Sequence, residues 1–136
     1  MPKPDIWKAA GVIIRDRKLL VNKSAKYDFY LSPGGKIELG ETPAQSLIRE
    51  LKEELNIDVT ESDFYYTSTI EEPAANDPSK ILKMEIFFVN NWRGELKASN
   101  EIIEIKWIDS TYPRERLGSV IASHIIPDLK AKNLID

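Results

Sequence analysis

The chain has 136 residues, of which 42% are hydrophobic and 30% are charged, and its net charge is −3. These values are typical of a folded protein with its own core, and we expect residues 1–136 to form a single domain. The charge argues against a nucleic-acid surface, which needs a basic stripe, and the lack of cysteine excludes disulfides and cysteine-ligated metal sites.

No apolar run approaches the roughly 18 residues that a membrane-spanning helix needs. The N-terminal residues MPKPDIWK do not have the pattern of a signal peptide. We therefore expect a cytoplasmic protein with no membrane partner.

The N-terminal part of the chain predicts a β-hairpin followed by a glycine-rich turn. Residues 6–15 and 18–23 are rich in β-branched and aliphatic side chains, and Asp16-Arg17 between them predicts a tight turn. The turn at residues 32–35, Ser-Pro-Gly-Gly, lets the backbone pack close to a ligand or a helix. We expect short strands before and after it, at residues 29–31 and 36–38.

A helix is predicted from Pro43 to Leu55. Thr42 and Gln45 have the spacing of a capping box, and Pro43 takes the first helical position. Asn56 favours the left-handed conformation that ends a helix. One face is apolar and must be buried; its members are Ala44, Leu47, Ile48, Leu51 and Leu55.

The same helix carries three glutamates on another face, Glu50, Glu53 and Glu54, at spacing i, i+3 and i+4. Like charges at this spacing repel each other, and they lie near the helix C-terminus, the unfavourable end for negative charge. A hard cation such as Mg²⁺ would turn the repulsion into attraction. The alternative is a solvated acidic face, which is the usual role of a charged cluster.

The rest of the chain predicts three strands, a loop and a closing helix. The strands are residues 64–70, 81–89 and 102–108, and the loop is residues 71–80, which contain two prolines. A helix is expected over residues 119–133, where Pro127 should kink or split it. Strands interleaved with two helices indicate an α/β fold, with a sheet covered on both faces.

Residues 35–57 resemble the signature of the Nudix hydrolase (MutT-like) family. The family pattern is Gly, five residues, Glu, seven residues, Arg-Glu, an apolar residue, any residue, Glu-Glu, any residue, Gly and an apolar residue. The matching positions here are Gly35, Glu41, Arg49, Glu50, Glu53, Glu54 and Ile57. Asn56 departs from the pattern, since it replaces a glycine, but asparagine is also suited to a left-handed helix terminus.

The resemblance implies an α/β fold, also classed as α+β. It is an α/β/α sandwich with a mixed, curled β-sheet between helices. It also implies a hydrolase of phosphoric anhydride bonds in nucleotides, with Mg²⁺ as the cofactor and Mn²⁺ as an alternative. A metal ion can stand between carboxylates and a negatively charged diphosphate, and can activate water.

By the resemblance, the metal ligands are the three helix glutamates Glu50, Glu53 and Glu54, with Glu53 and Glu54 as the leading pair. Glu41 and the carbonyl of Gly35 are supporting ligands. Arg49 is expected to hold a carboxylate through bidentate bonds. One of these glutamates is expected to orient or deprotonate the attacking water.

Candidates outside the signature are weaker. Glu101 precedes Trp107 by six positions and, as in several family members, is a candidate metal ligand or general base; Glu104 competes for that role. His124 is more typical of a helix surface or core residue than of a catalyst. An aromatic side chain can stack on a base and a lysine can pair with phosphate. The candidates for substrate contact are Trp7, Lys8, Tyr30 and Lys36.

The resemblance leaves the substrate open. A short domain without extensions favours nucleoside triphosphates, oxidised ones included, which would give the monophosphate and pyrophosphate. Pro73 follows Ile57 by sixteen positions, a spacing found in some ADP-ribose-cleaving members. ADP-ribose or another nucleoside diphosphate derivative is therefore the alternative, and a non-catalytic nucleotide-binding module is a third. We expect a nucleotide partner, no nucleic acid, and a monomer or homodimer.

Overall fold

A mixed, curled sheet organises the chain, and the computed structural model describes it over residues 4–74 and 77–136. The strands are β1 (Ile6–Arg15), β2 (Lys18–Ser24), β3 (Gly34–Lys36), β4 (Phe64–Ala74), β5 (Asp77–Val89) and β6 (Ile102–Ile108). Their order is β4-β5-β1-β2-β6, with β3 paired to β1. The β1–β5 pair is parallel and the others are antiparallel.

The sheet divides along β1. The first half of this strand pairs with β3 through Lys8, Ala9 and Ala10, whereas its end pairs with β2 through Ile14 and Arg15. Asp16 and Arg17 have φ of 52° and 62°, so the hairpin turn is of the primed type that matches strand twist. The predicted turn is confirmed, and the division brings the glycine turn beside the middle of the sheet.

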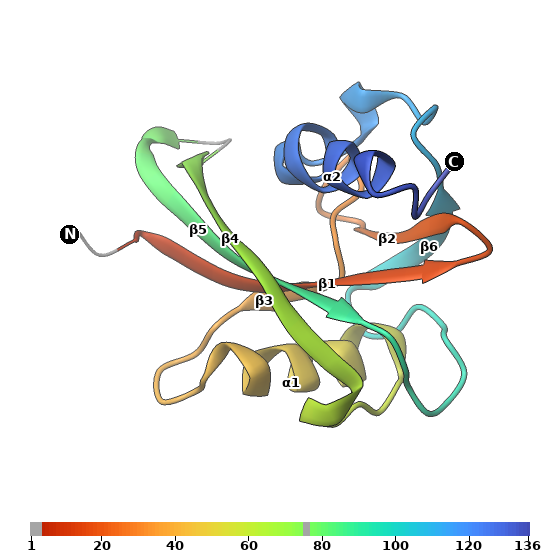
Figure 1. Ribbon diagram of the computed structural model, residues 1–136. Helices are drawn as coiled ribbons and strands as arrows, with labels where there is room; N and C mark the ends of the chain where they lie inside the picture. The colour runs from red at the N-terminus through yellow and green to blue at the C-terminus, as the bar shows by residue number, and fades with distance from the viewer. Residues whose placement is uncertain (1–3, 75–76) are drawn as a thin grey trace.

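Helical segments cover the two faces of the sheet, as Figure 1 shows. The helix α1 (Pro43–Leu55) lies on one face and buries Leu47, Leu51 and Leu55 against Ala9 and Ile13 of β1. The helix α2 (Ile126–Ala131) and the residues before it pack on the other face. The expected α/β/α arrangement is therefore confirmed.

Both predicted ends of α1 are confirmed. Thr42 Oγ1 accepts from the Gln45 backbone N–H at 3.1 Å, and Gln45 Oε1 accepts from the Thr42 N–H at 2.9 Å. Asn56 has φ 61° and ψ 30°, and its N–H caps the last turn. The capping box and the left-handed Asn56 thus begin and end α1 as the sequence indicates.

Two predicted strands differ from the structure. Residues 29–31 form isolated bridges only, in which Tyr30 pairs with Leu117 and Leu31 with Asn22. The third strand is Gly34–Lys36 rather than residues 36–38, because the glycines themselves pair with β1. Local side-chain preference did not indicate this pairing, since glycine is depleted in strands.

The loop predicted over residues 71–80 is wrong wherever the structure describes it. Here β4 runs to Ala74 and β5 begins at Asp77, and only residues 75–76 lie outside the described part. Pro73 is tolerated because β4 is an edge strand of the sheet. Along β5, the pairing with β1 begins only at Leu82. Pro78 lies before that point, so its missing N–H costs no bond to β1.

The closing helix is split, as Pro127 predicts. Residues Ile121–Ile125 form a π-helical segment, in which the Ile126 N–H bonds to the carbonyl of Ile121, and α2 follows. Proline has no N–H and its ring would clash with the carbonyl four residues earlier, so the wider turn accommodates it. The expected helix is thus shorter than residues 119–133. None of the helices in residues 4–74 and 77–136 is long and apolar enough to cross a bilayer.

We predict that Asn56→Gly leaves the free energy of unfolding almost unchanged, whereas Asn56→Ala lowers it by about 1 kcal/mol. A Cβ disfavours the left-handed conformation, which glycine adopts freely and asparagine tolerates. Urea unfolding of the three proteins measures the difference. Equal stability of the alanine variant and the wild type would contradict the role of Asn56 as a helix terminus.

Candidate active site

The glycine turn brings the backbone of β3 against the side chains of α1. Gly34 has φ 137°, and a Cβ built on it would lie 2.0 Å from the carbonyl oxygen of Ala9. Its N–H donates to Glu54 Oε1 at 2.9 Å. Only a residue without a side chain fits this position, so the turn allows a carboxylate of α1 to bond directly to the sheet.

Gly35 leaves room for a second carboxylate. A Cβ at this residue would lie 2.6 Å from the carboxyl carbon of Glu50. The Glu50 carboxylate therefore occupies the space that any other residue at position 35 would fill. The paired glycines explain how two glutamates one helical turn apart both reach the same backbone segment.

Three carboxylates meet at this point. Glu50, Glu54 and Glu101 each offer an oxygen, and these oxygens lie within 4.8 Å of one another. We call these three residues the carboxylate cluster. Glu54 is 6% exposed and Glu50 is 9% exposed, whereas Glu101 faces solvent. Clustered carboxylate oxygens are the ligands that Mg²⁺ and similar hard cations prefer.

The loop before β6 holds Glu101 beside α1. The carbonyls at the end of α1 accept from this loop: Ser99 N–H bonds to Glu54 O at 3.0 Å and Asn100 Nδ2 to Glu53 O at 2.8 Å. Helix C-termini leave such carbonyls without partners inside the helix. The loop thus caps α1 and positions Glu101 with the same bonds, which spacing in the sequence did not indicate.

Burial raises the pKa of both helix glutamates in the cluster. The pKa of Glu54 rises to about 8, chiefly because burial penalises the charged form, although the Gly34 N–H opposes the shift; the charges of Glu50 and Glu101 add to it. The pKa of Glu50 also rises through burial, opposed by Arg49. Two buried carboxyl groups near a third are suited to a divalent cation, which would favour their charged forms.

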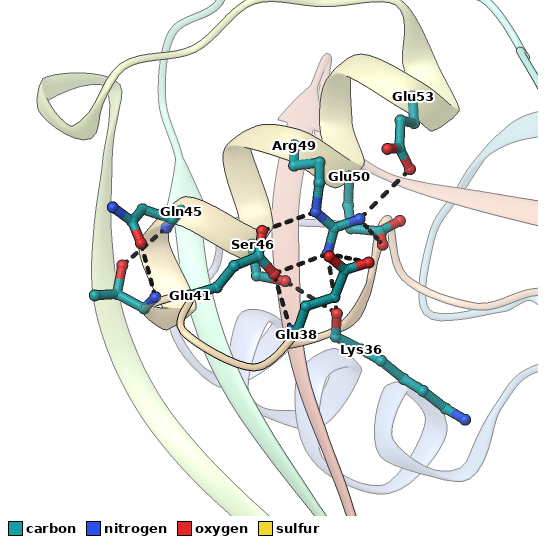
Figure 2. Close-up of polar contacts among 9 residues, drawn as sticks. Lys36, Glu38, Glu41, Gln45, Ser46, Arg49, Glu50 and Glu53 are labelled. Atoms are coloured by element: carbon teal, nitrogen blue, oxygen red, sulfur yellow. Dashed lines mark hydrogen bonds and ion pairs between the residues drawn. The ribbon is translucent and has the colours of Figure 1, made fainter.

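Arg49 organises the other side of the cluster, as Figure 2 shows. Its guanidinium bonds to both oxygens of Glu41, with Nε at 2.8 Å and Nη2 at 2.9 Å, and to Glu50 Oε1 at 2.8 Å. Its Nη2 also donates to the carbonyl of Lys36 at 3.1 Å. These bonds lower the pKa of Glu41 to about 2. The expected bidentate grip of Arg49 on a carboxylate is present, and it orients Glu50.

Glu53 and Glu41, expected as ligands, do not share the position of the cluster. The Glu53 side chain is 49% exposed, and its Oε2 lies 3.5 Å from Arg49 Nη1. The Glu41 oxygens are both engaged by Arg49. A helix rotates each residue by about 100°, so Glu50 and Glu54 point to the glycine turn while Glu53 lies beside them at the rim.

Two connected cavities open beside the cluster. The larger, of about 650 Å³, is lined by the cluster with Lys8, Lys36 and Asn22, and we call it the carboxylate cavity. The smaller, of about 260 Å³, lies towards the residues before α2, and we call it the side cavity. Both are lined by Lys8, Gly34, Gly35 and Lys36, so one ligand could occupy both.

Comparison with known proteins agrees with this arrangement. The model of the NUDIX domain matches residues 6–128. The chain belongs to the Nudix family. An 8-oxo-dGTP diphosphatase of Proteus vulgaris is 39% identical over 71% of this chain and 86% of its own length. A CTP pyrophosphohydrolase of Escherichia coli K12 is 33% identical over 90% of this chain and 87% of its own. The solution structure of the E. coli ORF135 protein superposes with a TM-score of 0.74 at 26% identity, covering 96% of this chain and 94% of that one.

The four expected substrate residues of this Nudix chain divide into two groups. Lys8 and Lys36 line both cavities, and burial together with the charge of Lys36 lowers the pKa of Lys8. Trp7 alternates to the opposite face of β1, where its Nε1 donates to Glu85 at 2.8 Å. Tyr30 is 2% exposed and belongs to the core, so its side chain does not line either cavity. Expecting substrate contact from these two aromatics neglected strand alternation and burial.

The structure also places the other residues outside the Nudix signature relative to the carboxylate cluster. Glu104 engages the hydroxyl of Tyr30 rather than the cluster. His124 lies on the surface of the C-terminal segment, with Nε2 at 3.4 Å from Glu72 Oε2. Asn22, which the sequence reading overlooked, is 2% exposed and its Nδ2 lies 3.5 Å from Glu54 Oε1. A polar residue within the apolar strand β2 was the signal that could have indicated it.

We predict that Gly35→Ala weakens binding of Mg²⁺ by roughly tenfold or more while the fold is kept. The added Cβ displaces the flexible end of Glu50, and residues that orient metal ligands typically have effects of this size. Isothermal titration with Mg²⁺ or Mn²⁺ measures the affinity, and urea unfolding checks the fold. Unchanged affinity would show that Glu50 does not depend on the space at Gly35.

We also predict a pH-dependent stability that Glu54 causes in metal-free protein. Its pKa is 4.5 in a model peptide and about 8 in the fold, so the folded state binds the proton more tightly. The contribution of Glu54 to the free energy of unfolding therefore falls as pH rises from about 4.5 to about 8. Glu54→Gln should unfold at a higher temperature than wild type at pH 8, and the gain should shrink at pH 5.

Thermal unfolding in the presence of a chelator tests this prediction. Glu53→Gln is the matched control, because Glu53 is half-exposed and immediately precedes Glu54 in the same helix. If the wild type and Glu54→Gln have the same dependence on pH, Glu54 does not carry a raised pKa.

Proposed function

We propose that this chain is a Mg²⁺-dependent Nudix pyrophosphohydrolase. Its proposed substrates are nucleoside triphosphates, oxidised ones included, which it hydrolyses to the monophosphate and pyrophosphate. The observation that carries the proposal is the carboxylate cluster at a cavity that also contains two lysines, in a chain of the Nudix family. The relatives named 8-oxo-dGTP diphosphatase and CTP pyrophosphohydrolase support this choice of substrate.

The donor set of the cluster fits a divalent metal ion. Glu50, Glu54 and Glu101 would hold it. The buried pair also receives hydrogen bonds from Arg49, the Gly34 N–H and Asn22. When bound, Mg²⁺ supplies charge neutralisation for phosphate oxygens and a lowered pKa for water. Glu53 and Glu41 have weaker support as ligands, since Arg49 engages both carboxylates. The Gly35 carbonyl stays a proposed supporting ligand. Mn²⁺ is the alternative ion.

The protein groups around the cluster have separate roles in this proposal. Lys8 and Lys36 bind phosphate oxygens from the floor of the shared cavities. Water attacks a phosphorus of the anhydride, the P–O bond to the pyrophosphate breaks, and the proton passes to a carboxylate. Glu101 is the proposed acceptor because it is the solvent-facing member of the cluster. Arg49 positions Glu50 without contacting substrate.

Two alternatives belong to the same assay. The first is hydrolysis of ADP-ribose, which the spacing of Pro73 after Ile57 suggests. Pro73 is exposed on β4 and lines neither cavity. Its neighbours Glu72 and Ala74 line the side cavity. A non-catalytic nucleotide-binding module is the other alternative. We also propose that residues 1–136 work as one domain, either as a monomer or as a homodimer.

We predict that Glu101→Gln and Glu54→Gln each slow turnover at least tenfold, equivalent to about 1.4 kcal/mol in the barrier. Glu53→Gln should have a smaller effect, because its carboxylate lies outside the cluster. Steady-state kinetics at saturating Mg²⁺ compares the three variants. A larger loss in Glu53→Gln than in Glu54→Gln would move the metal centre to the rim of α1.

The deciding experiment is a hydrolysis screen with Mg²⁺, with the slower variant Glu54→Gln as the control. The substrates are canonical and oxidised nucleoside triphosphates, ADP-ribose, nucleotide sugars and diadenosine polyphosphates. Pyrophosphate released from a triphosphate supports the proposal. AMP released from ADP-ribose instead would favour the alternative enzyme, and stabilisation by nucleotides without turnover would favour the binding module.

A further inference from the structure

The side cavity contains a carboxylate that the proposed chemistry does not use. Glu72 lies on the edge strand β4 opposite Leu82 of β5, and both line the cavity. Its neighbours Glu71 and Pro73 are exposed, as alternation along the strand requires. The side chain of Glu72 is 17% exposed, so the carboxylate is held at the wall of the cavity rather than in bulk water.

Glu72 links the β4–β5 hairpin to the segment that precedes α2. Ser119 Oγ donates to Glu72 Oε1 at 2.5 Å, and His124 Nε2 lies 3.4 Å from Oε2. Figure 1 shows the last part of β4, the first part of β5 and the C-terminal helical segment on the same side of β1. A carboxylate has about four lone-pair positions, and these contacts occupy two of them. Glu72 can therefore accept hydrogen bonds from a ligand without losing either partner.

The rest of the side cavity is suited to a flat ring. Tyr27 and Phe29 stack with centroids 5.0 Å apart and form one wall, and aliphatic side chains form the others. The aliphatic members include Leu82, Met84, Val120 and Ile121. Binding sites of this kind combine apolar walls with a few polar groups that fix orientation. Aromatic side chains also stack on nucleobases.

The side cavity adjoins the carboxylate cavity. The side cavity and the carboxylate cavity share Lys8, Gly34, Gly35 and Lys36, so a ring in the side cavity leaves its phosphates next to the cluster. An acceptor at the far wall would then meet the edge of the ring. The edge of guanine carries two adjacent donors, N1–H and the 2-amino group, which match the two oxygens of a carboxylate. Cytosine offers one amino donor next to an acceptor nitrogen. Uracil and thymine offer one N3–H donor between two carbonyls, which repel the second oxygen of a carboxylate.

We propose that Glu72 is a specificity-determining residue, which selects guanine-type bases through the N1–H and 2-amino donors. This inference rests on the proposed hydrolysis of nucleoside triphosphates and names the base that this site prefers. The order of preference is guanine nucleotides first, cytosine nucleotides next, and uracil or thymine nucleotides last. Oxidation at position 8 leaves the two donors in place, so Glu72 accepts oxidised and normal guanine equally.

The experiment compares dGTP with dITP, which differ only in the 2-amino group. For the wild type, kcat/KM should be about tenfold or more higher for dGTP, the size of a good bidentate contact. Glu72→Gln keeps the volume but replaces one acceptor oxygen by a donor amide. It should reduce the ratio to below threefold, mainly by lowering the value for dGTP.

Glu71→Gln is the matched control, since Glu71 is the adjacent and exposed glutamate of the same strand. It should keep the wild-type ratio. An equal loss for dGTP and dITP in Glu72→Gln would show that Glu72 only ties β4 to the C-terminal segment, and equal kcat/KM in the wild type would overturn the inference directly. The wild-type comparison does not depend on whether Glu72→Gln folds.

Failure of the proposed function is separable from failure of this inference. If no triphosphate is hydrolysed, the affinities of wild-type protein for dGMP and dIMP decide the role of Glu72. Binding of dIMP at least tenfold weaker than dGMP supports base selection at the side cavity. Equal affinities overturn it.

Discussion

The burial of Glu54 against the backbone of Gly34 is the constraint on which the site depends. A carboxyl group in this position has a pKa of about 8, so the fold by itself disfavours its charge. The Gly34 N–H, Arg49 on Glu50, and the rigid packing of Leu47, Leu51 and Leu55 keep the carboxyl groups together in spite of this cost. Burying these carboxyl groups thus lowers the stability of the metal-free fold. It also places their oxygens where a divalent cation would bind them.

The same hydrogen bonds serve structure and chemistry in several places. Ser99 and Asn100 satisfy carbonyls at the end of α1 and at the same time hold Glu101 in the cluster. The guanidinium of Arg49 bonds to Glu41, Glu50 and the carbonyl of Lys36. It therefore ties the loop before α1 to the helix. The Arg49 contacts with Glu41 and Glu50 are bidentate or charge-assisted, so they fix direction as well as distance. The site is therefore held by the secondary structure rather than by mobile side chains.

The two cavities separate the proposed chemistry from the proposed recognition. The cluster lies between α1, β3 and the loop before β6, whereas the side cavity lies between the β4–β5 hairpin and the segment before α2. Lys8 and Lys36 belong to both, which suits phosphates that connect a base to a reacting anhydride. Changes on β4 could alter the preferred base while the cluster stays intact. Glu72 is the polar group through which the present chain would exercise that choice.

The sequence by itself determined the helix α1, its two caps, its buried face, most strands and the family, because these depend on local spacing and local backbone preference. It also indicated Glu50, Glu54, Glu101 and the bidentate role of Arg49. Only the tertiary structure decided that Glu53 lies at the rim, that Trp7 and Tyr30 lie away from the cavities, and that β4 and β5 continue through residues 71–74 and 77–80. The capping loop and the position of Glu72 were likewise beyond the sequence. Their positions depend on which strands pair and which faces they bury, and these pairings join residues far apart in the chain.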